Sequence, residues 1–225
     1  MTSRPLTTST NEDSDTPEAY QIGWVPFLST KIYLDSHPLI PRTETEWWCE
    51  QAIAAMKGLT TPHVLDLFSG SGCVGVAVLY HVPQAFVDFG ELEARHLSTI
   101  EKNITLNSDG SRTRVFQTDI WSNVPSAYDV VLANPPYLAT SRNDRIEASV
   151  LKHEPHEALY AADDGYDLIQ RTIDGLFSHL RPGGQCWIEH EPEHTARISV
   201  SARKLGLTAT VHKDQYGVER YSVIL

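Results

Sequence analysis

Short apolar runs alternate with helix-like segments along most of the chain. Four runs have the length and apolar content of buried strands, at residues 63–68, 86–91, 114–121 and 128–133. Apolar residues at helical spacing lie between them, after Gly75 up to Tyr80 and at 94–106. Strands that alternate with helices predict an α/β fold with a mostly parallel sheet.

The C-terminal part continues this alternation. It contains a predicted helix, a turn, a strand, a second helix and two closing strands, at 166–180, 181–184, 185–189, 193–204, 207–213 and 219–225. Only a short turn at Tyr216-Gly217 separates the last two strands, so we expect an antiparallel hairpin at the edge of a seven-stranded sheet. Asp163-Asp164-Gly165 is expected to cap the first of these helices. We find no internal repeat and no second domain.

The first part of the chain has a different pattern. Residues 1–19 are polar and rich in Ser, Thr, Asp and Pro, which predicts a disordered tail. A single domain is expected over 20–225, in which 20–60 form an N-terminal cover, either a short hairpin or an extended segment, and the first helix. Thr43 with Glu46 three residues later predicts a capping box at the start of that helix.

Composition narrows the classes of function. Among the 225 residues the formal net charge is −11, and no dense Lys/Arg cluster is present, so a duplex nucleic acid is an unfavourable partner and a basic protein surface a better one. Three widely spaced cysteines indicate neither a disulfide framework nor a metal site. No apolar run approaches the roughly 18 residues of a membrane span. We expect a cytoplasmic protein without membrane contact, and a mitochondrial address stays open as an alternative. The sequence indicates no oligomeric state.

The first predicted strand leads directly into a glycine turn and a helix. Gly70 and Gly72 in this turn allow the backbone and the helix N-terminus to approach a ligand. The next strand ends in Glu91, about 20 residues later, where a carboxylate can bind both hydroxyls of a ribose. Asp88 is the alternative acid, but the helix that starts near Ala94 favours Glu91 for the carboxyl edge. These signals predict a nucleotide-type cofactor site.

The third and fourth predicted strands bring polar residues to the same edge. Asp119 can accept a hydrogen bond from an adenine amine, with Ile120 or Trp121 packed on the ring, although it could also be only a turn or cap residue. The fourth strand is followed by Asn134. Ligands of open α/β sheets bind at this edge, so four successive strand ends predict one binding crevice.

Asn134-Pro135-Pro136-Tyr137 supplies the candidate chemistry. Two prolines fix φ and remove two backbone donors, which predicts a stiff extended loop. The Asn134 side-chain oxygen and the bare Pro135 carbonyl could together accept both hydrogens of a planar NH2 group, while the Tyr137 ring stacks on it. A proline-rich turn without a ligand is the alternative. Residues 139–156 are polar and aperiodic, and we interpret them as a loop or short helices that form a substrate lid.

Several motifs together resemble the class I S-adenosylmethionine-dependent methyltransferases, and more closely the PrmC/HemK family, which methylates a glutamine side-chain amide in peptide-chain release factors. The resemblance covers 39–225. Its motifs are Leu39-Ile40-Pro41-Arg42-x-Glu44-Thr45-Glu46, Asp66-Leu67-x-Ser69-Gly70-Ser71-Gly72, Asn134-Pro135-Pro136-Tyr137, Glu154-Pro155-x-x-Ala158-Leu159 and Glu189-His190. Adenine-N6 methyltransferases of DNA and RNA share only Asn-Pro-Pro-Tyr and are the alternative.

The resemblance implies a Rossmann-like class I fold, S-adenosylmethionine as cofactor, no metal, and a release factor as protein substrate methylated on the glutamine of a Gly-Gly-Gln motif. The implied catalytic residues are Asn134, Pro135 and Tyr137. The implied cofactor residues are Arg42, Thr45, Asp66, Phe68, Gly70, Gly72, Glu91, Asp119, Ile120, Trp121 and Asn134. The implied substrate residues are Asn134, Pro135, Pro136, Tyr137 and Glu154. Bacterial members carry a helical N-terminal domain that helps to dock the release factor, and about twenty polar residues stand in its place here.

Overall fold

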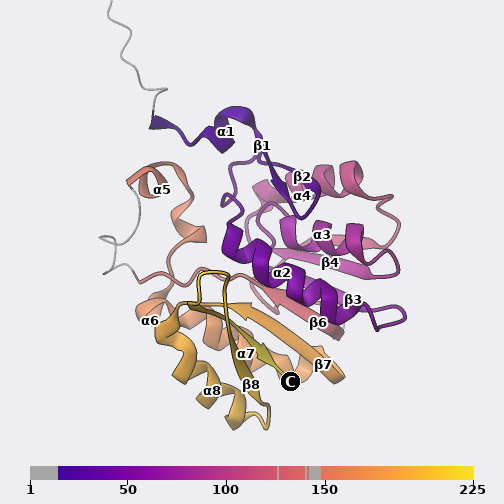
Figure 1. The fold of residues 1–225 in the computed structure, drawn as a ribbon, viewed down its shortest axis with the longest axis vertical. Coiled ribbons are helices and arrows are strands. Elements are labelled where there is room, and N and C mark those ends of the chain that lie inside the picture. The colour runs from indigo at the N-terminus through magenta and orange to yellow at the C-terminus, as the bar shows by residue number, and fades with distance from the viewer. Residues whose placement is uncertain (1–14, 126, 140, 142–147) are drawn as a thin grey trace, which may run out of the picture.

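A twisted sheet runs through the molecule between layers of helices (Figure 1). Its seven strands lie in the order β5-β4-β3-β6-β7-β9-β8. The computed structural model describes residues 15–125, 127–139, 141 and 148–225. The strands are β3 (His63–Leu67), β4 (Phe86–Glu91), β5 (Thr113–Gln117), β6 (Tyr128–Ala133), β7 (Leu180–Glu189), β8 (Ala209–Lys213) and β9 (Glu219–Ile224). The first five are parallel, whereas β9 is antiparallel to both β7 and β8. The predicted α/β class, the mostly parallel sheet and the C-terminal hairpin are confirmed.

Two strand boundaries differ from the prediction. β5 ends at Gln117 rather than at Trp121, and Ile120 has φ of 51°, a left-handed conformation that no strand residue adopts. β7 begins at Leu180, so the segment 181–184 lies within the strand. The pairing register with β6 shifts between Tyr128 and Val130, which accommodates the extra residues.

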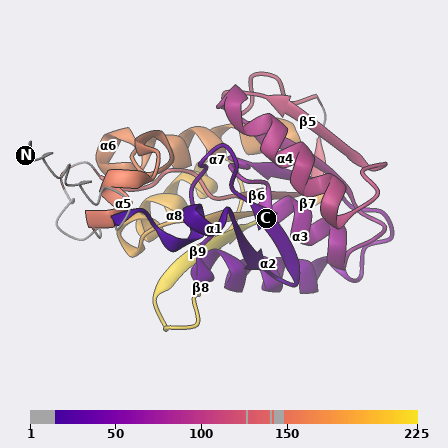
Figure 2. The same cartoon turned by 90° about the horizontal axis from the view of Figure 1, so that it is seen from above.

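Helices cover both faces of the sheet and form two cores. On one face α2 (Thr43–Met56), α3 (Cys73–His81) and α4 (Ala94–Asn107) share an apolar core with the N-terminal hairpin. On the other face α7 (Asp167–His179) and α8 (Thr195–Lys204) pack on the sheet. Figure 2 shows α2 and α7 on opposite sides of β6. Among the described residues, no helix has both the length and the apolar content needed to cross a membrane.

The N-terminal cover is a hairpin. Helix α1 (Glu18–Ile22) leads into β1 (Trp24–Phe27) and β2 (Thr30–Tyr33), which pair antiparallel. Asn103 of α4 holds this hairpin, because its side chain exchanges two hydrogen bonds with the backbone of Tyr33. Of the predicted disordered tail, 1–14 lie outside the described residues, and α1 begins within the remainder.

Both predicted helix caps are wrong. α2 begins at Thr43 with Arg42 at the N-cap position and no side-chain cap, because Glu46 instead accepts a hydrogen bond from the backbone N–H of Leu28 at 2.7 Å. The cap expected at 163–165 is absent too, since α7 has Tyr166 at its N-cap position and makes no side-chain cap. The carboxylate of Glu46 therefore joins α2 to the turn of the hairpin.

Short helices surround the loop after β6. They are α5 (Ala148–His153), η3 (His156–Ala158), α6 (Ala162–Gly165) and η4 (Pro192–His194). Gly165 has φ of 87°, and a Cβ atom there would lie 2.0 Å from the carbonyl oxygen of Tyr137. Only glycine therefore fits where α6 packs against the end of the Asn134–Tyr137 loop. The predicted lid is described only in part, because residues 140 and 142–147 lie outside the described ranges.

Candidate active site

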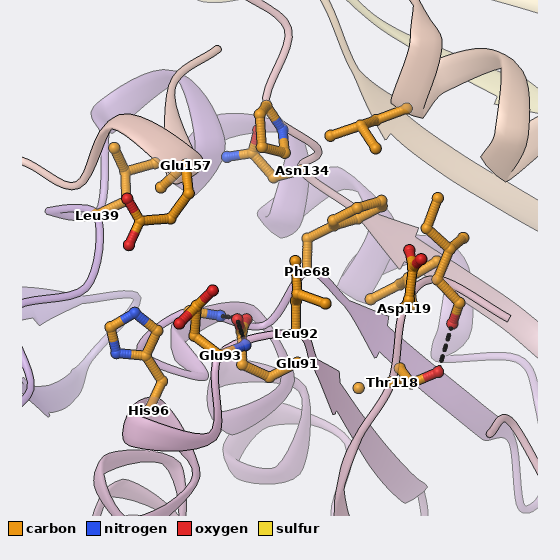
Figure 3. Close-up of a pocket in the computed structure, with 17 residues that line it drawn as sticks. Leu39, Phe68, Glu91, Leu92, Glu93, His96, Thr118, Asp119, Asn134 and Glu157 are labelled. Carbon is orange, nitrogen blue, oxygen red and sulfur yellow. Dashed lines mark hydrogen bonds between the residues drawn. The ribbon is translucent and has the colours of Figure 1, made fainter. Parts of the chain in front are cut away.

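The carboxyl ends of β3, β4, β5 and β6 meet at one cavity, called here the apolar cavity. Phe68, Leu92, Ile120 and Leu168 form much of its wall, and Asn134 lies at one side of it. Figure 3 shows Phe68 and Asp119 on one side of this space and Leu39, His96 and Glu157 on the other. The four strand ends that the sequence singled out therefore converge in space.

Strained backbone shapes the apolar cavity at two strand ends. Phe68 follows β3 with φ of 62°, and Ile120 follows β5 with φ of 51°. Left-handed conformations are unfavourable for residues with a Cβ atom and are retained where the surrounding structure enforces them. The first turn follows β3 directly and the second lies three residues after the end of β5. Each leaves an apolar side chain in the cavity wall, which suits the flat apolar faces of a purine.

Glu91 is the buried acid of the apolar cavity. Its Oε2 accepts the N–H of Gly70 at 2.7 Å, and its Oε1 accepts the N–H of Glu93 at 2.9 Å. A carboxylate has about four acceptor sites, so these bonds fix its orientation and leave capacity for two further donors. Burial raises the pKa of Glu91. Asp88 is not at the cavity, because it accepts hydrogen bonds from Arg114 and Tyr128.

Asp66 and the two predicted glycines differ in their placement. Asp66 and Gly70 line a small space beside the apolar cavity, together with Thr45. Asp66 accepts the N–H of Gly75 at 2.9 Å, and burial raises its pKa to about 8. Gly72 lines neither space, since its φ of 78° forms the turn into α3 and a Cβ atom there would crowd Ile100. Its function in the structure is to form the turn.

Asp119 and Ile120 line the apolar cavity, but Trp121 does not. Asp119 Oδ1 accepts a hydrogen bond from Arg171 Nη2 at 2.8 Å and forms an ion pair with it. The indole of Trp121 stacks on His179 with ring centroids 4.4 Å apart, and its N–H points to the carbonyl oxygens of 171 and 172. Of the two residues predicted to pack on an adenine, the structure places Ile120 at the cavity and turns Trp121 toward α7.

A second space, called here the polar cavity, adjoins the apolar cavity. Its charged and polar lining is Arg42, Glu44, Tyr137, Glu189, Glu191 and Arg220. Asn134 lines both cavities, Pro135 lines the polar one and Pro136 the apolar one. The tetrapeptide therefore separates the two spaces, and the side chain of Asn134 stands at their junction.

Glu189 joins the tetrapeptide to α2. Its Oε1 accepts the hydroxyl of Tyr137 at 2.8 Å, and its Oε2 accepts Thr45 Oγ1 at 2.7 Å and Trp48 Nε1 at 2.6 Å. The side-chain nitrogen of Asn134 donates to Thr45 Oγ1 at 3.2 Å. Thr45, expected at a cofactor, is buried within this network and also lines the small space beside the apolar cavity. Burial and the adjacent carboxylate raise the pKa of Tyr137 well above its usual value, which keeps the phenol neutral.

Sequence reasoning assigned no function to Glu189. Two signals were available: the residue ends a predicted strand, as Glu91 does, and it lies in the Glu189-His190 motif. The partners in these contacts are separated by between 52 and 144 positions along the chain. No local pattern indicates partners at such separations.

Glu154, expected to bind substrate, has a different environment. Its Oε1 accepts Arg42 Nη2 at 2.6 Å, and its Oε2 accepts the backbone N–H of Ile40 at 3.1 Å. The side chain of Glu154 is only 1% exposed. Glu154 ties the segment 154–159 to the loop before α2, and its contact with a substrate stays a prediction. Arg42 is one-third exposed and lines the polar cavity.

Comparisons with known proteins agree with this geometry. The family model described as "Methyltransferase small domain" matches residues 51–159. The chain is 35% identical over 211 residues to the release factor glutamine methyltransferase of Bordetella pertussis, covering 92% of this chain and 76% of that protein. It is 31% identical to the protein of the same name from Rhodopirellula baltica, covering 91% and 72%.

Solved structures share the fold at low sequence identity. The ribosomal protein L11 methylase of Lactobacillus delbrueckii subsp. bulgaricus superposes with a TM-score of 0.61 and 17% identity, covering 84% of this chain and 80% of that one. The hMettl16 catalytic domain in complex with the MAT2A 3'UTR hairpin 6 gives a TM-score of 0.64 and 18% identity, covering 84% and 72%. These similarities show a common fold.

Proposed function

Since the chain belongs to the family of release factor glutamine methyltransferases, we propose that it transfers the methyl group of S-adenosylmethionine to a glutamine side-chain amide nitrogen in a release factor. The glutamine of a Gly-Gly-Gln motif is the expected acceptor. The observation that carries the proposal is the position of Asn134, whose side chain lines both the apolar and the polar cavity. A methyl donor in one space and an amide in the other would meet at this residue.

The apolar cavity fits the proposed cofactor. Glu91 has two acceptor sites left for ribose hydroxyls, since each oxygen already accepts one backbone N–H. Phe68 and Ile120 supply apolar surface for an adenine ring, and Asp119 lies nearby to accept from its amine. S-adenosylmethionine supplies an electrophilic methyl group on a positively charged sulfur.

The residues of the tetrapeptide would prepare the amide for attack. An amide nitrogen is a poor nucleophile because its lone pair is delocalised. Asn134 Oδ1 and the Pro135 carbonyl would accept both of its hydrogens, polarise the nitrogen and aim it toward the apolar cavity. Tyr137 is held by Glu189 and would support the planar amide with its ring. The proton released after transfer would pass to water.

The proposal is tested by transfer of labelled methyl from S-adenosylmethionine to a recombinant release factor. The matched control is the same factor with the Gly-Gly-Gln glutamine changed to alanine, and DNA and tRNA are offered in parallel. Label on the factor, lost in the alanine variant, is the expected result. Label on nucleic acid but not on the factor would contradict the proposal and favour the adenine-N6 alternative.

A further inference from the structure

We infer that Thr45 and Glu189 are positioning residues that fix which way the Asn134 amide faces, so that its oxygen is available to the substrate. The inference rests on the proposed function, because it assigns these two side chains a part in the same methyl transfer. Neither residue needs to touch the substrate amide. Their effect passes through the hydrogen bond between Thr45 and Asn134.

Glu189 is the shared acceptor of the hydrogen bonds from Thr45, Trp48 and Tyr137. It is the last residue of β7 and is 1% exposed. Its carboxylate accepts hydrogen bonds from three donors on two other segments. Thr45 and Trp48 lie three positions apart on α2 and therefore share one face of that helix. Tyr137 approaches from the loop after β6. A buried carboxylate is stable only when several donors satisfy it, and these three donors hold it in one orientation.

The direction of each hydrogen bond follows from this carboxylate. Burial raises the pKa of Glu189, while the hydrogen bonds from Trp48, Thr45 and Tyr137 favour its ionised form. The ionised carboxylate only accepts, so the single hydroxyl hydrogen of Thr45 is committed to Glu189 at 2.7 Å. The Thr45 oxygen can then only accept from Asn134. The Asn134 group that faces Thr45 must therefore be its NH2, as the 3.2 Å contact has it, and its Oδ1 faces away from Thr45. Without Glu189, the threonine hydroxyl could donate to Asn134 Oδ1, and the amide could turn over.

The same carboxylate orients the other end of the tetrapeptide. Tyr137 donates its hydroxyl to Glu189 Oε1, while Asn134 is held through Thr45 on Oε2. One side chain thus sets the acceptor and the aromatic ring relative to each other. The positioning requires a hydrogen-bonding group at 45 and not merely its volume, which separates it from a packing function.

The test replaces Thr45 by valine, which keeps the branched shape and removes the hydroxyl, and by serine, which keeps the hydroxyl. Thr30→Val is the matched control, because Thr30 is equally buried, donates its hydroxyl to the Phe27 carbonyl and lines neither cavity. We expect Thr45→Val to lower kcat about 10- to 100-fold, as misplacement of a reacting group does. Thr45→Ser should recover most of that loss, and Thr30→Val should not lower kcat.

Two further readouts separate positioning from damage to the fold or to the cofactor site. The dissociation constant of S-adenosylmethionine, measured by calorimetry, should stay within about threefold in Thr45→Val because the cavity wall is retained. The side-chain amide signals of Asn134 in 15N-labelled protein should shift in Thr45→Val and return in Thr45→Ser. An unchanged kcat in Thr45→Val, or equal losses in the valine and serine variants, would overturn the inference.

Failure of the proposed function gives a different result. If the unaltered protein labels no release factor, the proposed function fails, and the amide signals still report whether Thr45 and Glu189 orient Asn134. If the unaltered protein is active and the valine and serine variants are equally active, only the positioning inference fails.

Discussion

The two cavities on either side of Asn134 are built by different means. In the apolar cavity, backbone groups do most of the orienting, since Gly70 and Glu93 donate their N–H groups to Glu91 and left-handed turns place Phe68 and Ile120. In the polar cavity, side chains orient one another. Glu189 binds Thr45, Trp48 and Tyr137, while Arg42 pairs with Glu154 over 112 positions.

The two cavities should therefore respond to different substitutions. A site oriented by backbone depends on the turns and tolerates changes in side chains that only line it. A site oriented by side chains loses its geometry when one buried partner is removed, because the remaining polar groups are left unsatisfied. We therefore expect substitutions to divide into those that affect cofactor affinity and those that affect turnover.

The largest effect is expected for Asn134→Ala, which removes the group shared by both cavities. We expect kcat to fall about 10²- to 10³-fold, as when one preorganised hydrogen-bonding group is removed. The dissociation constant of S-adenosylmethionine should change little, because the apolar cavity keeps Glu91 and its apolar wall. Single-turnover kinetics and calorimetry measure the two quantities, and Asn107→Ala, at the last residue of α4 and in the lining of neither cavity, is the control. Equal losses in both quantities would contradict the division of functions between the cavities.

Glu91→Gln should have the opposite signature. The amide cannot accept all the donors that the carboxylate accepts, so we expect the cofactor dissociation constant to rise about 10- to 100-fold, the cost of one or two charge-assisted hydrogen bonds. At saturating cofactor, kcat should stay within about threefold of the unaltered protein. A dissociation constant that does not change would show that Glu91 does not hold the ribose.

The pH dependence of cofactor binding tests the same function of Glu91. Burial raises the pKa of Glu91, so this carboxylate gains a proton at a higher pH than an exposed glutamate does. The protonated form loses an acceptor site, and cofactor affinity should therefore decrease as pH falls through the raised pKa. Calorimetry over a pH series should show this decrease in the unaltered protein and a weaker one in Glu91→Gln.

Arg42→Met tests the polar half at its ion pair with Glu154. The substitution keeps the side-chain length and leaves a buried carboxylate without its cation. We expect a loss of about 1–3 kcal/mol in the free energy of unfolding, below the range for a fully buried pair because Arg42 is one-third exposed. Urea denaturation measures it. Adding Glu154→Gln should restore part of the free energy of unfolding. If it restores none, the Arg42–Glu154 ion pair does not account for the loss.

The smallest effect on binding is expected for Trp121→Phe. The ring stacks on His179 away from the apolar cavity, so the cofactor dissociation constant should stay within about twofold. Loss of the indole hydrogen bonds should lower the free energy of unfolding by about 1 kcal/mol. A clear loss of cofactor affinity in a folded Trp121→Phe variant would show that Trp121 contributes to cofactor binding.

The two cavities also differ in how far the sequence predicts them. The sheet, its strand ends and the convergence of Glu91, Asp119 and Asn134 follow from local periodicity and from the rule that parallel strands share a carboxyl edge. Prediction failed where a side chain binds a partner that is distant in the sequence. Glu46 binds the hairpin turn instead of capping α2. The pairing of Glu154 with Arg42, 112 positions away, was likewise not predicted.

Trp121 illustrates a second limit. The prediction carried β5 through to residue 121, whereas the left-handed turn at Ile120 redirects the chain after Gln117. Such a conformation in a β-branched residue is enforced by tertiary packing and is not encoded by its propensity. The side chain that reaches the cavity is therefore decided by a turn that local sequence does not reveal.

The most direct test of the central claim locates the methyl group by tandem mass spectrometry after reaction with S-adenosylmethionine and a release factor. We expect one methyl group on the side-chain nitrogen of the Gly-Gly-Gln glutamine, formed by the unaltered protein and greatly reduced in Asn134→Ala. A methyl group on another residue, or equal modification by Asn134→Ala, would contradict the claim.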